Sequence, residues 1–368
     1  MRDALTRFFA SRGGIILAGG IIGLVAALLQ KLGNPPNMGI CVACFGRDIA
    51  GALGLHRAAV VQYLRPEIPG FVLGSCLAAL LFREFRARTG SAPVVRYFLG
   101  VFAMIGALAF LGCPWRALLR LAGGDLNAIV GLLGLGVGIS VGVAFLKRGY
   151  SLGRTHPART AVGWILPVTM LGLLIMAAAR PSYLLASVKG PGAMHAPLLL
   201  SLLAGLLIGF LAQRTRFCTM GSIRDVILAR DVHLITGVAA LVVVAFVVNL
   251  VLGAFRIGIT ATPVGHSAHV WNFLGMALAG LAFALAGGCP GRQFFLAGEG
   301  DADAGVFVIG LITGAAFAHN FGLAGKPDQI IEGVLHVGGP AWNGQIAVLL
   351  GITFCLVLGF AMRERWDA

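Results

Sequence analysis

Charged residues are scarce in this chain of 368 residues. Asp, Glu, Lys and Arg together make up only 11% of it, whereas hydrophobic residues make up 58%. Soluble globular domains carry about 25% charged residues. So little charge excludes an ordinary soluble domain and indicates an integral membrane protein.

Acidic residues are rarer still. The chain has 14 Asp and Glu residues against 28 Lys and Arg residues, which gives a formal net charge of +14. A nucleic-acid-binding protein usually gathers its basic residues in one patch or stripe, but here they are spread over many short segments with no basic tail. We therefore expect no nucleic-acid partner. The positive excess favours a bias in membrane topology and attraction for small anions.

Motifs for nucleotides, metals and cofactors are missing as well. No G-x-x-x-x-G-K-[ST] sequence occurs, which argues against direct use of ATP. Cys41 and Cys44 form a C-x-x-C, but a zinc site needs four ligands, and the nearest histidine is His56, with no second cysteine pair in the segment. We expect no metal, no cofactor and no enzymatic activity.

Ten apolar stretches approach the length of about 20 residues that a helix needs to cross a bilayer. Two of them, 68–82 and 271–287, are short for a full crossing. Glycine is abundant at 54 residues, and small residues let membrane helices approach closely. This pattern predicts an all-α fold, a polytopic membrane protein with nine or ten transmembrane helices. The stretches are 13–30, 68–82, 96–112, 128–146, 161–179, 197–212, 233–253, 271–287, 305–322 and 345–362.

The second half of the chain repeats the first at an offset of about 176 residues. In transporters, two such repeats commonly build one site between them. Five stretches per half is an odd number, so the second half should enter the membrane from the opposite side. We expect inverted repeats at 1–180 and 181–368 in one membrane domain. The matches are Cys41, Arg47 and Asp48 with Cys218, Arg224 and Asp225; Gly112–Arg116 with Gly288–Arg292; and Gly134 and Gly138 with Gly310 and Gly314.

Loop charge predicts the orientation, because Lys and Arg in short loops favour the cytoplasm. With the N-terminus inside, most of the 28 basic residues fall in cytoplasmic segments. We expect both termini in the cytoplasm, the first-half cysteine loops outside and the second-half cysteine loops inside. Residues 13–30 lack a clear cleavage site for a signal peptidase and are expected to be a retained helix.

The motif Gly-Cys-Pro-x-Arg occurs twice, around Cys113 and Cys289. Proline is favoured at the first position of a helix, so each cysteine should cap a short helix whose first N–H groups are unpaired. Arg116 and Arg292 follow one turn later, and a helix start beside positive charge attracts anions. A thiol is a weak donor that suits a soft sulfur or selenium anion. The alternative is a tight helix start that holds no ligand.

Redox chemistry is a further alternative for Cys41 and Cys44. A C-x-x-C pair can have a lowered thiol pKa and exchange disulfides. Its repeat counterpart keeps one cysteine, because Gly221 stands at the position of Cys44. A permeation role, a structural role and a redox role stay open for Cys41, with permeation favoured. Cys76 and Cys355 lie inside apolar spans and are expected to be structural.

Ionisable residues near the membrane interior are costly and indicate function by default, usually with a charged partner. Arg47–Asp48 and Arg224–Asp225 are two such pairs, although a solvated loop end would also account for them. Asn127 and Asp303 are further candidates for the substrate path. An equally good interpretation makes them part of the caps of the helices that follow.

These motifs resemble those of the YeeE/YedE family of sulfur and selenium transporters, which includes a thiosulfate uptake transporter. The resemblance lies in the paired Gly-Cys-Pro-x-Arg motifs, in Arg216–Ser222 (RFCTMGS) and in Cys113–Asp125 (CPWRALLRLAGGD). It covers nearly the whole chain and is closest to the selenium-associated YedE branch, to whose pattern Trp115 and the Cys41–Cys44 pair belong.

The resemblance implies a multi-pass protein of the bacterial inner membrane whose two halves form an hourglass. Cys113, Cys218 and Cys289 would lie at its waist and Cys41 at the entrance. A thiosulfate-like or selenium oxyanion would pass between thiols by hydrogen bonds, without covalent chemistry. The resemblance also implies a possible cytosolic partner, a small sulfur carrier of the TusA type.

The sequence thus favours a transporter for a small sulfur- or selenium-containing anion. Two hypotheses of other classes remain. One is a membrane thiol-disulfide oxidoreductase that uses Cys41 and Cys44, and the other is a membrane anchor for a TusA-like carrier.

Overall fold

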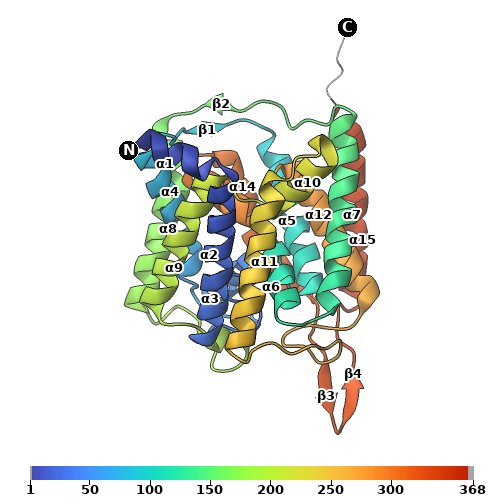
Figure 1. Ribbon diagram of the computed structural model, residues 1–368. Helices are drawn as coiled ribbons and strands as arrows, with labels where there is room; N and C mark the ends of the chain where they lie inside the picture. The colour runs from blue at the N-terminus through green and yellow to red at the C-terminus, as the bar shows by residue number, and fades with distance from the viewer. Residues whose placement is uncertain (1, 364–368) are drawn as a thin grey trace.

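The computed structural model describes residues 2–363, which fold into a bundle of helices with two short pairs of strands (Figure 1). Most helices run between two opposite ends of the bundle; α1 and the paired strands β1 and β2 lie at the upper end in this view, and the β3–β4 hairpin projects from the lower end. Both strand pairs are antiparallel, but only β3 and β4 form a hairpin, because three helices separate β1 from β2 in the chain. The elements are α1 (Arg2–Phe9), α2 (Arg12–Lys31), α3 (Val42–Ala52), α4 (Glu67–Leu81), β1 (Arg88–Thr89), α5 (Pro93–Phe110), α6 (Pro114–Ala122), α7 (Asn127–Lys147), β2 (His156–Pro157), α8 (Thr160–Ala179), η1 (Pro191–Ala193), α9 (Leu198–Thr215), α10 (Thr219–Ala229), α11 (His233–Val251), α12 (His269–Ala286), α13 (Pro290–Gly298), α14 (Ala302–Asn320), β3 (Gln329–Ile331), β4 (Val334–His336) and α15 (Trp342–Ala361).

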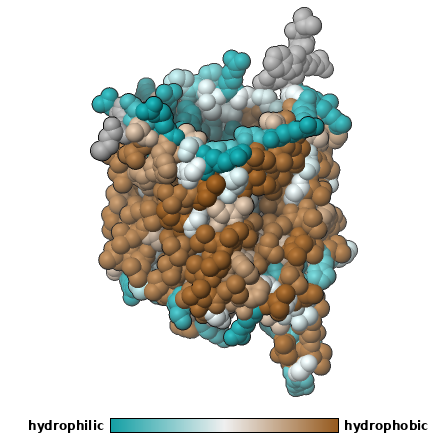
Figure 2. All heavy atoms as spheres, viewed as in Figure 1, coloured by the Kyte–Doolittle hydropathy of each residue, from teal (hydrophilic) through white to brown (hydrophobic). Residues whose placement is uncertain are grey.

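Within the described residues, nine helical segments are long and apolar enough to cross a membrane. A helix coincides with each of the ten predicted apolar stretches. The helix that is not among the nine is α4, at stretch 68–82, whose 15 residues are short for a crossing. On the face shown in Figure 2, a broad hydrophobic band crosses the molecule, with hydrophilic residues gathered toward its ends. The predicted all-α polytopic membrane fold is confirmed.

The main helix pairings join one half of the chain to the other. Helix α7 packs on α12 and α5 on α14, while α2 packs on α11 and α4 on α9. These are matching pairs under the sequence offset, since α12 corresponds to α5 and α14 to α7. Helices α5 and α12 also pack on each other at the centre. The two halves are therefore interleaved in one body rather than separate domains.

The repeated glycines lie where helices from the two halves touch. A Cβ atom at Gly134 would meet the carbonyl oxygen of Phe273 on α12, and one at Gly138 would meet that of Ala277. On α14, Gly310 and Gly314 face the α5 backbone in the corresponding way. Close approach of membrane helices requires small residues at such contacts. The glycine match in the sequence therefore marks the α7–α12 and α5–α14 interfaces.

Replacing Gly134 by alanine is expected to lower the thermal unfolding temperature of the purified protein. The added methyl group overpacks the α7–α12 contact, which typically costs about 1–3 kcal/mol. Gly136, two residues along α7, is the matched control, because a methyl group added there would have no neighbouring atom within 4 Å. Gly136→Ala should leave stability unchanged or raise it slightly, because alanine favours helix by about 1 kcal/mol. Equal melting curves for the two variants would contradict this account of the interface.

Candidate functional site

Four cysteines occupy the N-cap positions of the four short helices that lie in the cysteine loops. Cys41 caps α3, Cys113 caps α6, Cys218 caps α10 and Cys289 caps α13. Proline follows at the first helical position of α6 and α13, so the predicted caps there are confirmed. Helices α3 and α6 lie toward the lower half of the bundle, and α10 lies at the upper end (Figure 1). Each cysteine thus stands beside backbone N–H groups that a helix leaves unpaired.

The four thiols form two pairs, one in each half of the chain. In the first thiol pair, the Sγ atoms of Cys41 and Cys113 are 3.8 Å apart. In the second, those of Cys218 and Cys289 are 3.7 Å apart. All four are free thiols and buried. Each pair joins the two cysteine loops of its own repeat, although Cys41 and Cys113 are 72 residues apart in the chain.

Hydrogen bonds orient one thiol of each pair in the same way. The Sγ of Cys41 accepts the backbone N–H of Cys44 at 3.3 Å, and the Sγ of Cys218 accepts that of Gly221 at 3.2 Å. The Cys44 thiol itself lies 3.8 Å from the carbonyl oxygen of Leu111. Cys44 and Gly221 hold matched positions, and each donates its backbone N–H to the thiol of the capping cysteine. This hydrogen bond does not require a cysteine side chain at the donor position.

Arg116, three residues after Cys113, connects the first cysteine site to a loop from the second half of the chain. Arg116 is fully buried, and its guanidinium donates to the carbonyl oxygens of Leu111, Pro263 and Val264. It also lies 3.7 Å from the Cys44 sulfur. The arginine thus sits beside the cysteines, as its spacing predicted, and it also donates hydrogen bonds to the loop at Pro263 and Val264.

The second thiol pair opens onto a cavity of about 530 Å³ beside α10. Cys218 is 5% exposed, whereas Cys289 and Cys41 are fully buried, so Cys218 is the thiol that reaches the cavity. Arg292 lies 3.3 Å from Glu299 and also lines the space. The lining consists of Arg216, Cys218, Gly221, Arg224, Asp225, Leu234, Gly287, Arg292 and Leu296. Three arginines line this cavity, and each is paired with a carboxylate: Arg224 with Asp225, Arg292 with Glu299, and Arg216 with Glu84 and Glu299.

The two predicted Arg–Asp pairs differ in their surroundings. Asp48 lies 2.7 Å from both Arg47 and Arg65, and all three side chains are at most 2% exposed. Arg65 also donates to the carbonyl oxygens of Pro191 and Met194. A solvated loop end is therefore the wrong interpretation for Arg47 and Asp48. Sequence reasoning missed Arg65, which has no counterpart in the repeated motif.

The second pair is open to the cavity. Arg224 and Asp225 are 2.8 Å apart and are 33% and 22% exposed. Both line the space that Cys218 reaches. The same two residue types thus form a buried clamp in one half and part of a cavity wall in the other.

Asn127 and Asp303 fasten loops that come from the opposite half. Asn127 donates to the carbonyl oxygen of Ile259 at 2.6 Å. Asp303 accepts hydrogen bonds from Thr89 and from the backbone N–H of Ser91. These bonds lead to loop residues rather than to the thiols. Asn127 and Asp303 sit at the starts of α7 and α14, where each ties its helix to a segment of the opposite half.

Trp115 lies where the cysteine loops of the two halves meet. Its ring centroid is 5.9 Å from those of Phe217 and Phe295 and 6.0 Å from that of Phe71. A Cβ atom placed on Gly291 would lie 3.2 Å from the indole. Trp115 and Gly291 hold the same position in the two Gly-Cys-Pro-x-Arg motifs. In the sequence, this contact is marked by the large difference in size between Trp115 and Gly291 at matched positions.

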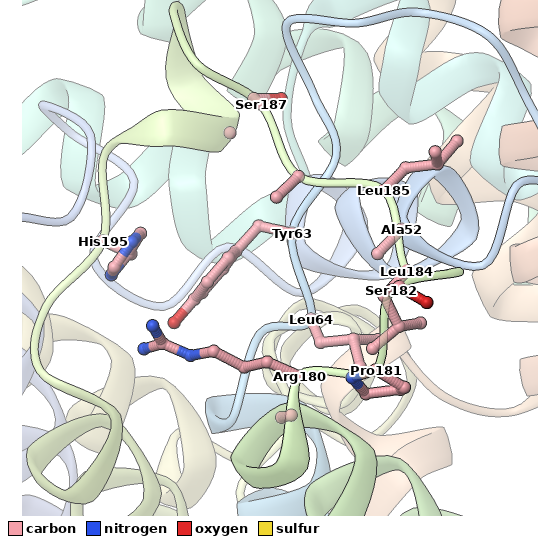
Figure 3. A pocket seen from close by; sticks show the side chains of 13 residues that line it. Ala52, Tyr63, Leu64, Arg180, Pro181, Ser182, Leu184, Leu185, Ser187 and His195 are labelled. Atoms are coloured by element: carbon pink, nitrogen blue, oxygen red, sulfur yellow. The ribbon is translucent and has the colours of Figure 1, made fainter.

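A second cavity, of about 330 Å³, lies at the end of α3 that is remote from Cys41 (Figure 3). Tyr63 and His195 stack there with ring centroids 4.2 Å apart, and the Arg180 side chain extends toward the Tyr63 phenol. The lining is mostly apolar and includes Leu64, Leu184 and Leu185. In residues 2–363 no group of three or more His, Cys, Asp or Glu side chains is placed to hold a metal ion.

Comparison with known proteins supports the resemblance to the YeeE/YedE family. Residues 214–368 match the family model described as "Sulphur transport". The thiosulfate transporter TsuA of Escherichia coli (strain K12) is 30% identical over 107 residues, which cover 29% of this chain and 30% of that protein. The aligned region therefore spans less than a third of that relative. Neither comparison concerns selenium.

Proposed function

We propose that this membrane protein carries a small sulfur-containing anion of the thiosulfate type along a path lined by its thiol pairs, in keeping with the sulphur transport match over residues 214–368. A selenium oxyanion of similar charge and shape falls within the same proposal. The observation that carries it is the arrangement of the four capping cysteines. Two halves of the chain each bring a pair of free thiols, two helix starts and an arginine to the interior.

The chemistry of the two thiol pairs fits an anion with a soft sulfur atom. A thiol is a weak, polarisable donor, and the N–H groups at a helix start together with the helix dipole favour negative charge. Arg116 lies near the first pair and Arg292 lines the cavity at the second. Weak donors bind such an anion without holding it tightly, which a transporter requires because binding must be followed by release.

The different access to the two thiol pairs supports a transporter seen in one of its conformations. The second pair reaches a cavity of about 530 Å³ through Cys218, while both thiols of the first pair are buried and Arg116 beside them binds the loop at Pro263 and Val264. Alternating access in transporters built from repeats involves two such states related by exchange of the open side. We propose that the cavity faces the cytoplasm of the bacterial inner membrane, in line with loop charge, and that both termini lie on that side. A TusA-like carrier is the proposed acceptor at the cavity mouth.

The test is uptake of radiolabelled thiosulfate by proteoliposomes that contain the purified full-length protein, with and without a proton gradient. We expect uptake well above that of protein-free liposomes and competition by unlabelled thiosulfate. Labelled sulfate, which lacks the sulfane sulfur, is the matched probe and should be taken up more slowly. Binding of a carrier protein without any flux would overturn the proposal and favour the anchor hypothesis.

A further inference from the structure

The indole of Trp115 separates the two cysteine sites at the centre of the molecule. It stands two residues after Cys113 on α6, and it packs against Phe217, the residue just before Cys218. Its ring also meets Gly291 on α13, two residues after Cys289. We propose that Trp115 is a gate that closes the path between the two thiol pairs and that its indole N–H binds the anion during passage. This inference rests on the proposed function and names a further substrate-contacting residue in it.

The fit between Trp115 and Gly291 accounts for the closed state. The two residues hold equivalent positions in the repeats, and the large side chain of one fills the space that the other leaves. Phe71, Phe217 and Phe295 complete a cage around the indole, and Trp115 is only 1% exposed. An anion cannot pass between the thiol pairs through this cage unless the indole moves. The indole packs directly on Gly291 because that residue has no side chain, so rotation of Trp115 away from α13 would open this contact.

The indole nitrogen of Trp115 gives independent support for contact with the anion. Among the residues that the structure describes, Trp115 Nε1 has no hydrogen-bond partner although the atom is buried. Buried donors in proteins are nearly always paired, and tryptophan N–H groups usually find an acceptor. Phenylalanine would fill an aromatic cage without leaving a donor unpaired. The unpaired donor is accounted for if its acceptor is the transported anion, which is absent while the gate is closed.

The cage suits an anion once the indole swings aside. The edges of aromatic rings carry partial positive charge, and Phe71 and Phe217 both meet Trp115 in an edge-to-face arrangement. The indole N–H is a donor only, so it favours an acceptor and cannot itself take a proton. The indole N–H would bind the anion between Cys113 and Cys218, where the proposed path has no thiol.

Three variants in proteoliposomes test the proposal, with thiosulfate as the probe. Trp115→Phe keeps the bulk and removes the N–H, and it should lower thiosulfate uptake by about tenfold, the effect of a lost hydrogen bond to a charged group. Trp115→Ala removes the barrier and should let preloaded gluconate, a larger anion, leak out of the vesicles, which wild-type protein retains. Trp342→Phe is the control, because Trp342 is 73% exposed at the start of α15, and it should transport as wild type.

Intrinsic fluorescence gives a readout that does not depend on flux. The chain has five tryptophans, and thiosulfate should shift the emission of wild-type protein and of Trp342→Phe but not that of Trp115→Phe. If the wild-type protein transports, undiminished uptake and an unchanged emission shift in Trp115→Phe would overturn the inference and leave the proposed function standing. Absence of uptake by wild-type protein would overturn the proposed function and this inference together. If Trp115→Ala does not fold, the Trp115→Phe results decide alone.

Discussion

Replacing Cys218 by alanine is expected to reduce thiosulfate uptake to the level of protein-free vesicles while the folded protein stays in the membrane. Cys218 is the thiol that reaches the cavity, and its Sγ also contacts Cys289 and the Gly221 N–H. Loss of a hydrogen bond to a charged group costs roughly 1.5–3 kcal/mol, or about 10- to 150-fold in rate or affinity. Cys113→Ala and Cys289→Ala should act in the same direction, because each removes one member of a thiol pair.

The remaining cysteines provide controls for this prediction. Cys355 is fully buried in α15 and Cys76 lies in α4, and neither belongs to a thiol pair. Cys355→Ala and Cys76→Ala should therefore leave uptake unchanged, apart from small packing effects. Cys218→Ser keeps a donor and loses polarisability, so partial uptake would separate hydrogen bonding from a requirement for sulfur. Normal transport in the alanine variants of Cys113, Cys218 and Cys289 would show that the path does not run along the thiols.

Local patterns in the sequence were enough to predict much of this fold. The apolar stretches predicted the helices because length and hydropathy alone decide whether a segment can span a bilayer. The caps at Cys113 and Cys289 followed from the proline after each cysteine, which is a constraint within one turn of the chain. The abundance of glycine predicted close helix contacts, but not that Gly134 and Gly138 would meet α12. These successes share a cause, since each feature depends on neighbouring residues or on the repeat.

The features that sequence reasoning missed depend on contacts between distant segments. Arg65 meets Asp48 only because the loop between α3 and α4 folds back on α3. Nothing in the sequence indicated that Arg116 would also donate hydrogen bonds to the distant loop at Pro263 and Val264. The Arg–Asp pairs looked equivalent in sequence, yet one is buried and the other borders a cavity. A repeat predicts matching backbone, and the burial of each side chain is then set by neighbours that the repeat does not share.

Because one of the two Arg–Asp pairs is buried and the other is not, the same substitution in each should change the stability of the protein by very different amounts. Asp48→Asn is expected to destabilise the protein by about 3–5 kcal/mol, the usual result of removing one partner of a buried ion pair. The Asp48 carboxylate lies between Arg47 and Arg65, and all three groups are shielded from water. With a neutral amide in its place, two guanidinium groups would face each other in the interior without a counter-charge. Such an unpaired charge at this depth is costly in any surrounding of low polarity.

The matched control is the same substitution in the other repeat. Asp225 pairs with Arg224 at 2.8 Å but is 22% exposed beside the cavity, and exposed pairs contribute only about 0–1 kcal/mol. Asp225→Asn should therefore melt close to wild type in detergent, whereas Asp48→Asn should melt several degrees lower. Thermal unfolding followed by loss of the monodisperse peak in size-exclusion chromatography measures both. Similar small shifts for the two variants would mean that the Arg47–Asp48–Arg65 cluster is solvated, and the burial argued for it would be wrong.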